Sequence, residues 1–193
     1  MSNYRPITDI WFLARAKLKG GERYYGAYLG GFPERARALL GCNINDPVLH
    51  VCGGKAKLYP YKRGFGPNDK TLDLDPQVNP DFLQDAREPW PLSISQTGSG
   101  GRDFWKGCLL DPPYSVEDAG HYAVGSGAYP SPILLVKRAF EVLPVGGRVG
   151  IIHYMPPAPP KNSVFVAAVG IICGFNNRIR CYSVFEKTAE EPK

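Results

Sequence analysis

The chain has 193 residues, which is enough for one domain with a well-developed core and too short for two domains of ordinary size. Its residues are 44% hydrophobic and 21% charged, and this composition excludes a generally disordered chain. The net charge of +5 is mild and the basic residues form no long run, so the charge permits a nucleic-acid partner without demanding one.

Cysteine spacing and the apolar runs exclude several classes of protein. The five cysteines form no C-x-x-C pair, and no histidine lies at zinc-finger spacing from them, so we expect reduced thiols and no metal site. The sequence shows no leader pattern and no apolar run as long as a membrane span. We therefore expect a soluble, cytoplasmic protein without a membrane partner.

The first third of the chain leads to a glycine turn. Residues 1–46 are expected to form an N-terminal cap segment, with loops and short segments over 1–32 and a short helix over 33–40. A buried strand is predicted at 47–51, and Gly53 and Gly54 follow it directly. Two glycines after a strand let the backbone approach a ligand closely, although an ordinary tight turn has the same sequence.

A basic loop follows the turn. Five basic residues within 55–70 alternate with aromatic residues, and Pro60, Gly64 and Pro67 exclude a long helix. The usual crossover helix is therefore expected to be short or missing. Such a loop could hold a nucleic-acid strand through phosphate contacts and base stacking, or it could be a solvated loop with some packed rings.

Two further short strands each end near an acid. The first is predicted at 71–76 and carries Asp73, and the next, at 82–85, ends in Asp85. An acid roughly 20 residues after a glycine turn is placed to accept hydrogen bonds from a ribose. Exposed turn aspartates are the alternative interpretation.

The stretch at 108–114 is the most informative part of the sequence. A buried apolar run ends abruptly in Asp111-Pro112-Pro113-Tyr114, and the prolines cannot continue a strand ladder. An acid, a proline carbonyl and an aromatic ring are thus held on a stiff turn at the edge where open α/β sheets bind ligands. Residues 116–131 are predicted to form a flexible loop over this site.

The remainder of the chain predicts one helix and three strands. The helix covers 132–143 and the first strand 148–153, while 164–173 and 179–185 form an antiparallel hairpin around Asn176 and Asn177. No repeat or linker indicates a second domain, and 188–193 form a polar tail.

This ordered set, over residues 47–187, resembles the class I S-adenosylmethionine-dependent methyltransferases. The resemblance implies a single-domain, Rossmann-like α/β three-layer sandwich, with some helices shortened or missing. Its mostly parallel, seven-stranded sheet has the order 3-2-1-4-5-7-6, with the last strand antiparallel. S-adenosylmethionine is the implied cofactor, and its binding residues are His50, Cys52, Gly53, Gly54, Asp73, Asp85, Ala86 and Asp111.

Residues Asp111, Pro112, Pro113 and Tyr114 are similar to the D-P-P-Y motif of amino-methyltransferases that act on adenine N6 or cytosine N4. The resemblance implies a nucleic-acid substrate whose amine donates hydrogen bonds to the Asp111 carboxylate and the Pro112 carbonyl. Tyr114 would stack on a base turned out of its helix. The acceptor could instead be a protein amide or a small-molecule amine.

Two positions depart from the family's pattern. His50 stands where the first strand usually ends in an acid, and Cys52 stands where a turn glycine is common. His50 could hydrogen-bond a water or the cofactor carboxylate, or be a buried histidine satisfied by the protein. A catalytically degenerate, cofactor-binding interaction module is therefore a further alternative. Nothing resembles a separate target-recognition domain, so a partner protein could supply sequence specificity.

Overall fold

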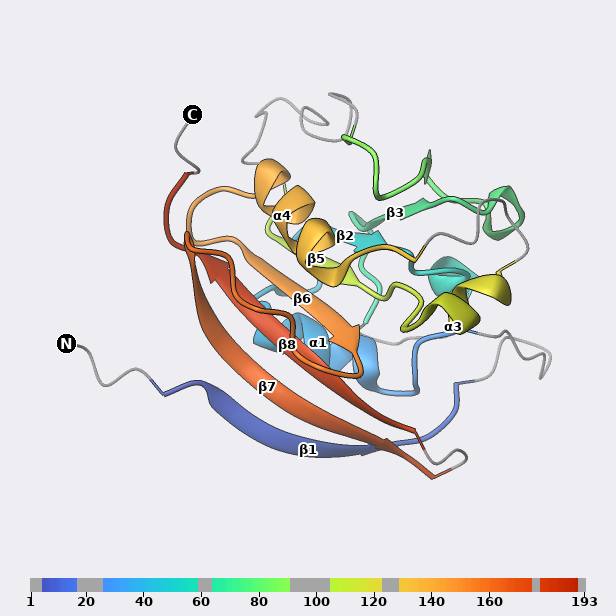
Figure 1. Cartoon of the computed structure of the whole chain (residues 1–193), viewed down its shortest axis with the longest axis horizontal. Helices are drawn as coiled ribbons and strands as arrows, with labels where there is room; N and C mark the ends of the chain where they lie inside the picture. Colours follow the sequence, from blue (N-terminus) through green and yellow to red (C-terminus); the bar gives the residue numbers. More distant parts are fainter. Residues whose placement is uncertain are drawn as a thin grey trace.

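The computed structural model describes residues 5–16, 26–58, 64–90, 105–122, 129–174 and 178–190. Eight strands form one sheet in the order β1-β7-β8-β6-β5-β2-β3-β4 (Figure 1). The strands are β1 (Ile7–Leu13), β2 (Val48–Val51), β3 (Lys70–Asp73), β4 (Phe82–Leu83), β5 (Gly107–Leu110), β6 (Arg148–His153), β7 (Ser163–Cys173) and β8 (Ile179–Lys187). The helices are α1 (Phe32–Leu39), α3 (Val116–Gly120), α4 (Pro132–Val142) and the short 3-10 helices η1 (Ala56–Leu58) and η2 (Pro76–Val78).

The predicted strand order is confirmed from β4 to β7. Strand β8 pairs antiparallel with both β6 and β7, and the other strand pairs are parallel. The sheet has eight strands rather than seven, because β1 pairs with the outer edge of β7 from Ile7 opposite Ala167 to Leu13 opposite Cys173. The sequence does not reveal β1 because its first four residues are all exposed and its buried alternation is confined to Trp11 and Leu13.

Each face of the sheet carries its own hydrophobic core. On one face, α4 buries Leu135, Ala139 and Val142, the three residues that its periodicity predicts to share a face (Figure 1). On the other face, Phe32 and Ala36 of α1 pack against the inner strands and β1. Parallel strands covered on both sides are nearly continuous apolar runs, and all four residues of β2 and of β5 are buried.

Two local predictions need correction. Strand β3 ends at Asp73 rather than 76, because the Asp75 carboxylate caps η2 by accepting a hydrogen bond from the Gln77 backbone N–H. The loop predicted at 116–131 begins with α3, whose first turn is capped by the Ser115 hydroxyl. Residues 123–128 of that loop, the hairpin tip expected at 175–177 and residues 59–63 of the basic loop lie outside the described residues.

The connection from β2 to β3 contains only η1 among its described residues, which agrees with a shortened or missing crossover helix.

All five cysteines are free thiols. None of the helices in the described ranges is long and apolar enough to cross a bilayer.

Candidate active site

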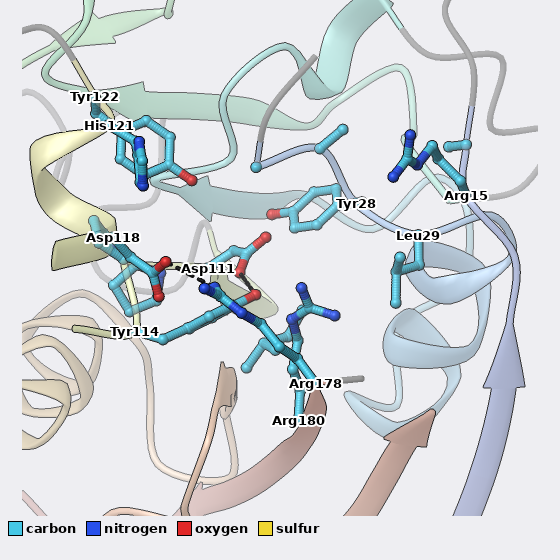
Figure 2. A pocket seen from close by; sticks show the side chains of 16 residues that line it. Arg15, Tyr28, Leu29, Asp111, Tyr114, Asp118, His121, Tyr122, Arg178 and Arg180 are labelled. Carbon is cyan, nitrogen blue, oxygen red and sulfur yellow. Dashed lines mark hydrogen bonds and ion pairs between the residues drawn. The ribbon is translucent and has the colours of Figure 1, made fainter. Parts of the chain in front are cut away.

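Asp111 follows the carboxyl end of β5, in the middle of the sheet. Its backbone N–H donates to the Val51 carbonyl at 3.0 Å, so Asp111 lies beside the end of β2. The Tyr114 hydroxyl donates to Oδ1 of Asp111 at 2.7 Å (Figure 2). The two polar groups of the motif are therefore joined, with the prolines between them forming the turn.

A pocket of about 590 Å³ lies beside this turn and is lined by all four residues of 111–114 (Figure 2). Tyr28, from the segment before α1, lines it as well, and its hydroxyl points toward Asp111 in this view. Of the residues expected to bind the cofactor, Asp111 is the one that lines this pocket.

Burial sets the ionisation of the motif. Desolvation raises the pKa of Asp111 to about 7, although the Tyr114 hydrogen bond and the charge of Arg180 act in the opposite direction. Burial, together with the charge of Asp111, raises the pKa of Tyr114 well above its usual value. Tyr114 is therefore a neutral hydrogen-bond donor, while Asp111 titrates close to neutral pH.

The ring of Tyr114 is held by contacts from β6 and β8. The Arg180 guanidinium carbon lies 5.3 Å from the ring centroid, and the ring of Tyr154 is 5.1 Å away. His153, at the end of β6, meets the same ring edge-on at 5.9 Å and is hydrogen-bonded to Tyr129. These contacts fix the aromatic wall of the pocket before any ligand binds.

The turn after β2 is tied to the end of β3. The Gly54 N–H donates to Oδ2 of Asp73 at 3.0 Å, and the Cys52 N–H donates to the Leu72 carbonyl at 2.9 Å. Both Cys52 and Gly54 have positive φ, at 55° and 52°. Cys52 thus adopts a left-handed conformation that glycine would adopt at lower cost. A Cβ at Gly53 would lie 3.2 Å from the Tyr28 hydroxyl, so this glycine permits close packing against Tyr28.

Four of the predicted cofactor residues come together around this turn. Burial is the main cause of the raised pKa of the Cys52 thiol, and the nearby carboxylates of Asp73, Asp111 and Asp85 raise it further. Burial likewise raises the pKa of Asp73. Acids from the ends of three different strands are therefore close enough to act electrostatically on one thiol.

Asp85 and Ala86 occupy the turn after β4. Arg87 donates hydrogen bonds to both Asp85 oxygens at 2.9 Å, and these lower the pKa of the Asp85 carboxyl. Ala86 is buried, and its carbonyl accepts a hydrogen bond from the Trp90 indole at 3.0 Å. Asp85 thus lies at the same sheet edge as Asp73, and its carboxylate is hydrogen-bonded to Arg87.

His50 has a different environment. Its Nε2 lies 3.1 Å from Oδ2 of Asp69, and its Nδ1 lies 3.3 Å from the Tyr28 hydroxyl. Asp69 is also paired with Arg37 and accepts the Gly66 N–H. Both ring nitrogens are therefore engaged inside the protein, as in the buried-histidine interpretation. The sequence gives no sign of this cluster, because Arg37 and Asp69 are far apart along the chain.

Comparisons in sequence find no matching protein-family model and no matching curated protein. Solved structures do match. TrmN from Thermus thermophilus aligns with a TM-score of 0.56 at 17% identity, over 84% of this chain and 50% of that one. The 1,6-didemethyltoxoflavin-N1-methyltransferase of Burkholderia thailandensis, with bound 1,6-didemethyltoxoflavin and S-adenosylhomocysteine, aligns with a TM-score of 0.50 at 13% identity. The alignment covers 82% of this chain and 79% of that one.

The chain shares the Rossmann-like fold of these solved methyltransferases. A putative S-adenosylmethionine-dependent methyltransferase from Streptococcus mutans also aligns, with a TM-score of 0.51 at 11% identity, over 83% of this chain and 50% of that one. At these identities the likeness concerns the fold. The chain spans half the length of both the TrmN chain and the Streptococcus mutans chain.

The methyltransferase fold also gathers residues that the sequence analysis missed. Because β8 is antiparallel to β6, its first residues lie at the edge where β5 and β6 end, with Cys181 opposite His153. This places Arg178 and Arg180 in the pocket. Their signal was present in the sequence, since two arginines two positions apart at the start of an antiparallel strand share one side of the sheet. Arg15, Tyr28 and Asp118 reach the pocket from segments without such a signal.

Proposed function

We propose that the chain is an S-adenosylmethionine-dependent methyltransferase that methylates an exocyclic amine of a nucleic-acid base, adenine N6 or cytosine N4. The observation that supports this best is the joined Asp111–Tyr114 pair in a pocket at the end of β5. Here a hydrogen-bond acceptor and an aromatic ring stand beside the acids that follow the neighbouring strands.

The donor set fits the proposed cofactor. Ribose hydroxyls and an adenine amine are hydrogen-bond donors, and Asp73 and Asp85 present carboxylate acceptors at the sheet edge where this fold class binds nucleotides. The Gly53-Gly54 turn and Cys52 would pack beside the cofactor, with Ala86 next to its adenine. When bound, S-adenosylmethionine supplies an electrophilic methyl group on a sulfonium.

The role of Asp111 follows from the chemistry of the acceptor. An exocyclic amine is a poor nucleophile because its lone pair is delocalised into the ring. Hydrogen bonds from its two N–H groups to the Asp111 carboxylate and the Pro112 carbonyl favour a pyramidal nitrogen with a directed lone pair. Holding the amine in this orientation can lower the barrier by about 7–11 kcal/mol, so the site needs no strong general base.

Tyr114 has two tasks in this proposal. Its ring stacks on the base, and this stacking offsets part of the cost of unstacking the base from its helix, which is a few kcal/mol. Its hydroxyl holds Asp111 in place until the amine arrives and shares or replaces the 2.7 Å hydrogen bond. The contacts from Arg180 and Tyr154 keep the ring in this position.

The test has two stages. Calorimetry with S-adenosylmethionine should show binding, and its absence at high cofactor concentration would remove the enzymatic proposal. Transfer of a tritiated methyl group should then be measured against DNA, RNA and protein extract in parallel. Label in nucleic acid supports the proposal, and label in protein alone favours an amide acceptor. Cofactor binding without transfer favours the degenerate module, for which the left-handed Cys52 is the structural argument.

A further inference from the structure

The pocket has a basic wall beside Asp111 and Tyr114. Arg178 directly precedes β8 and Arg180 is its second residue, and both line the pocket together with Asp111 and Tyr114 (Figure 2). Arg15 lines it from the segment after β1. The only carboxylates among the lining residues that the structure describes are Asp111 and Asp118. The charge of the wall therefore favours an anionic ligand.

Arg180 is the informative member of this wall. Its Nε is buried and has no hydrogen-bond partner within the described part of the chain. Its Nη1 donates to the Cys173 sulfur at 3.1 Å, and a thiol sulfur is a weak acceptor. Within the described residues Arg180 forms no salt bridge, although the charge of Asp111 acts on its guanidinium. The Arg180 guanidinium is partly buried beside Asp111 and the Tyr114 ring, and a bound anion would give its buried, unpaired Nε a charged partner.

Arg178 is held in place beside it. Its Nη1 donates to Oδ1 of Asp118 at 2.8 Å, and the buried Asp118 also accepts the Tyr154 hydroxyl at 3.2 Å. Asp118 thus acts as the support that fixes Arg178 at the pocket wall.

We propose that Arg178 and Arg180 form an anion subsite that binds a phosphate group of the acceptor while its amine lies at Asp111. Paired guanidinium groups bind phosphate with several charge-assisted hydrogen bonds and an ion-pair attraction, whereas a neutral amide or a neutral amine offers fewer acceptor sites and no negative charge. The inference rests on the proposed function and narrows it, since the acceptor is then a phosphate-bearing nucleotide unit rather than a free base or nucleoside.

The experiment measures binding without turnover. A fluorescent single-stranded oligonucleotide is titrated with the protein, and the same sequence is titrated with uncharged methylphosphonate linkages. We expect the uncharged strand to bind at least ten-fold more weakly. Arg178→Gln and Arg180→Gln should each weaken binding of the natural strand by ten-fold or more. Each should also reduce the slope of log K against log salt by about 0.7, the value for one phosphate on a single strand.

Two controls keep the result interpretable. Arg138→Gln removes an arginine from the outer face of α4, where it pairs with Glu141, and should leave affinity and slope unchanged. Arg180→Lys keeps the charge, so it should retain the slope of log K against log salt while its affinity for the strand falls. This variant still tests the proposal if Arg180→Gln folds poorly. Unchanged affinity and slope in both folded glutamine variants would overturn the proposal.

Mononucleotides distinguish the source of the phosphate. AMP that competes better than adenosine indicates the phosphate of the target nucleotide, and equal weak competition by both, with strong competition by an oligonucleotide, indicates a neighbouring backbone phosphate. Either result supports the subsite. Failure of the proposed function would look different, because phosphate-dependent binding would then persist without methyl transfer.

Discussion

The Tyr114 hydroxyl and the Asp111 carboxylate form a 2.7 Å hydrogen bond, so an incoming amine must compete with a protein donor for the same oxygen. Tyr114→Phe removes this competitor but keeps the ring. Because the hydrogen bond lowers the pKa of Asp111, its loss should raise that pKa. If the ionised carboxylate is the active form, the pH profile of methyl transfer should move to higher pH, with KM changed only a few-fold. An unshifted profile would contradict this coupling.

Asp111 itself should be indispensable for transfer. Asp111→Asn and Asp111→Ala should lower kcat by at least a hundred-fold, because the amine loses its anionic acceptor, while the cofactor Kd stays within a few-fold. Tritium transfer and calorimetry measure the two quantities. Asp9→Asn, an exposed change on β1, is the matched control and should be neutral. Undiminished turnover in Asp111→Ala would refute the assigned role.

The raised pKa of Asp111 also predicts a change of stability with pH. The carboxyl has a pKa of about 7 in the folded chain, against an ordinary value of 3.8. Between these values the folded state retains a proton that the unfolded state has lost, so this group makes stability fall as pH rises from about 4 to 7. Asp111→Asn removes the effect and should be more stable than the natural chain at pH 8, with little difference at pH 4. Urea unfolding of both proteins at the two pH values measures this. An equal difference in the free energy of unfolding at pH 4 and pH 8 would contradict the raised pKa of Asp111.

Asp73 should act on the cofactor. It accepts the Gly54 N–H at the turn after β2, so Asp73→Ala should lose both the ribose acceptor and the brace of the turn. We expect S-adenosylmethionine to bind at least ten-fold more weakly, whereas oligonucleotide binding stays unchanged. Calorimetry measures the cofactor affinity. Asp75→Ala, two residues away, is the control and should keep the affinity of the natural chain. The assignment fails if the cofactor binds Asp73→Ala as it binds the natural chain.

His50 offers a choice between two roles. Its ring nitrogens lie against Tyr28 and Asp69, so we expect His50→Asn to lower the free energy of unfolding by about 1–3 kcal/mol through lost buried hydrogen bonds. Cofactor affinity should remain within a few-fold. A strong loss of affinity without loss of stability would instead assign His50 to the cofactor.

Much of the fold was accessible from the sequence. Short apolar runs that end at prolines, glycines or acids predict five strands and a closing hairpin, and the order that the family resemblance implies agrees with the observed order from β4 to β7. Strand β1 was not predicted, because an exposed edge strand shows little alternation of buried and exposed residues in its sequence. Helix α3 escaped because five residues show no helical period, and its signal was limited to the cap at Ser115.

The site was less accessible for a physical reason. Asp73, Asp85 and Asp111 could be found because each follows its own strand, and parallel strands end at the same edge. The partners of His50, and the role of Asp118 as a support for Arg178, depend on contacts between segments distant in the chain. Such pairings leave no local pattern, so they become visible only in three dimensions.

The central claim is that the Asp111–Tyr114 turn directs a methyl group to an exocyclic amine of a base, and nucleoside analysis tests it most directly. Oligonucleotides incubated with the protein and S-adenosylmethionine are digested to nucleosides and examined by mass spectrometry. We predict a methyl group on adenine N6 or cytosine N4, absent when Asp111→Asn replaces the natural chain. Methylation confined to a ring nitrogen, a ring carbon or a protein side chain would contradict it.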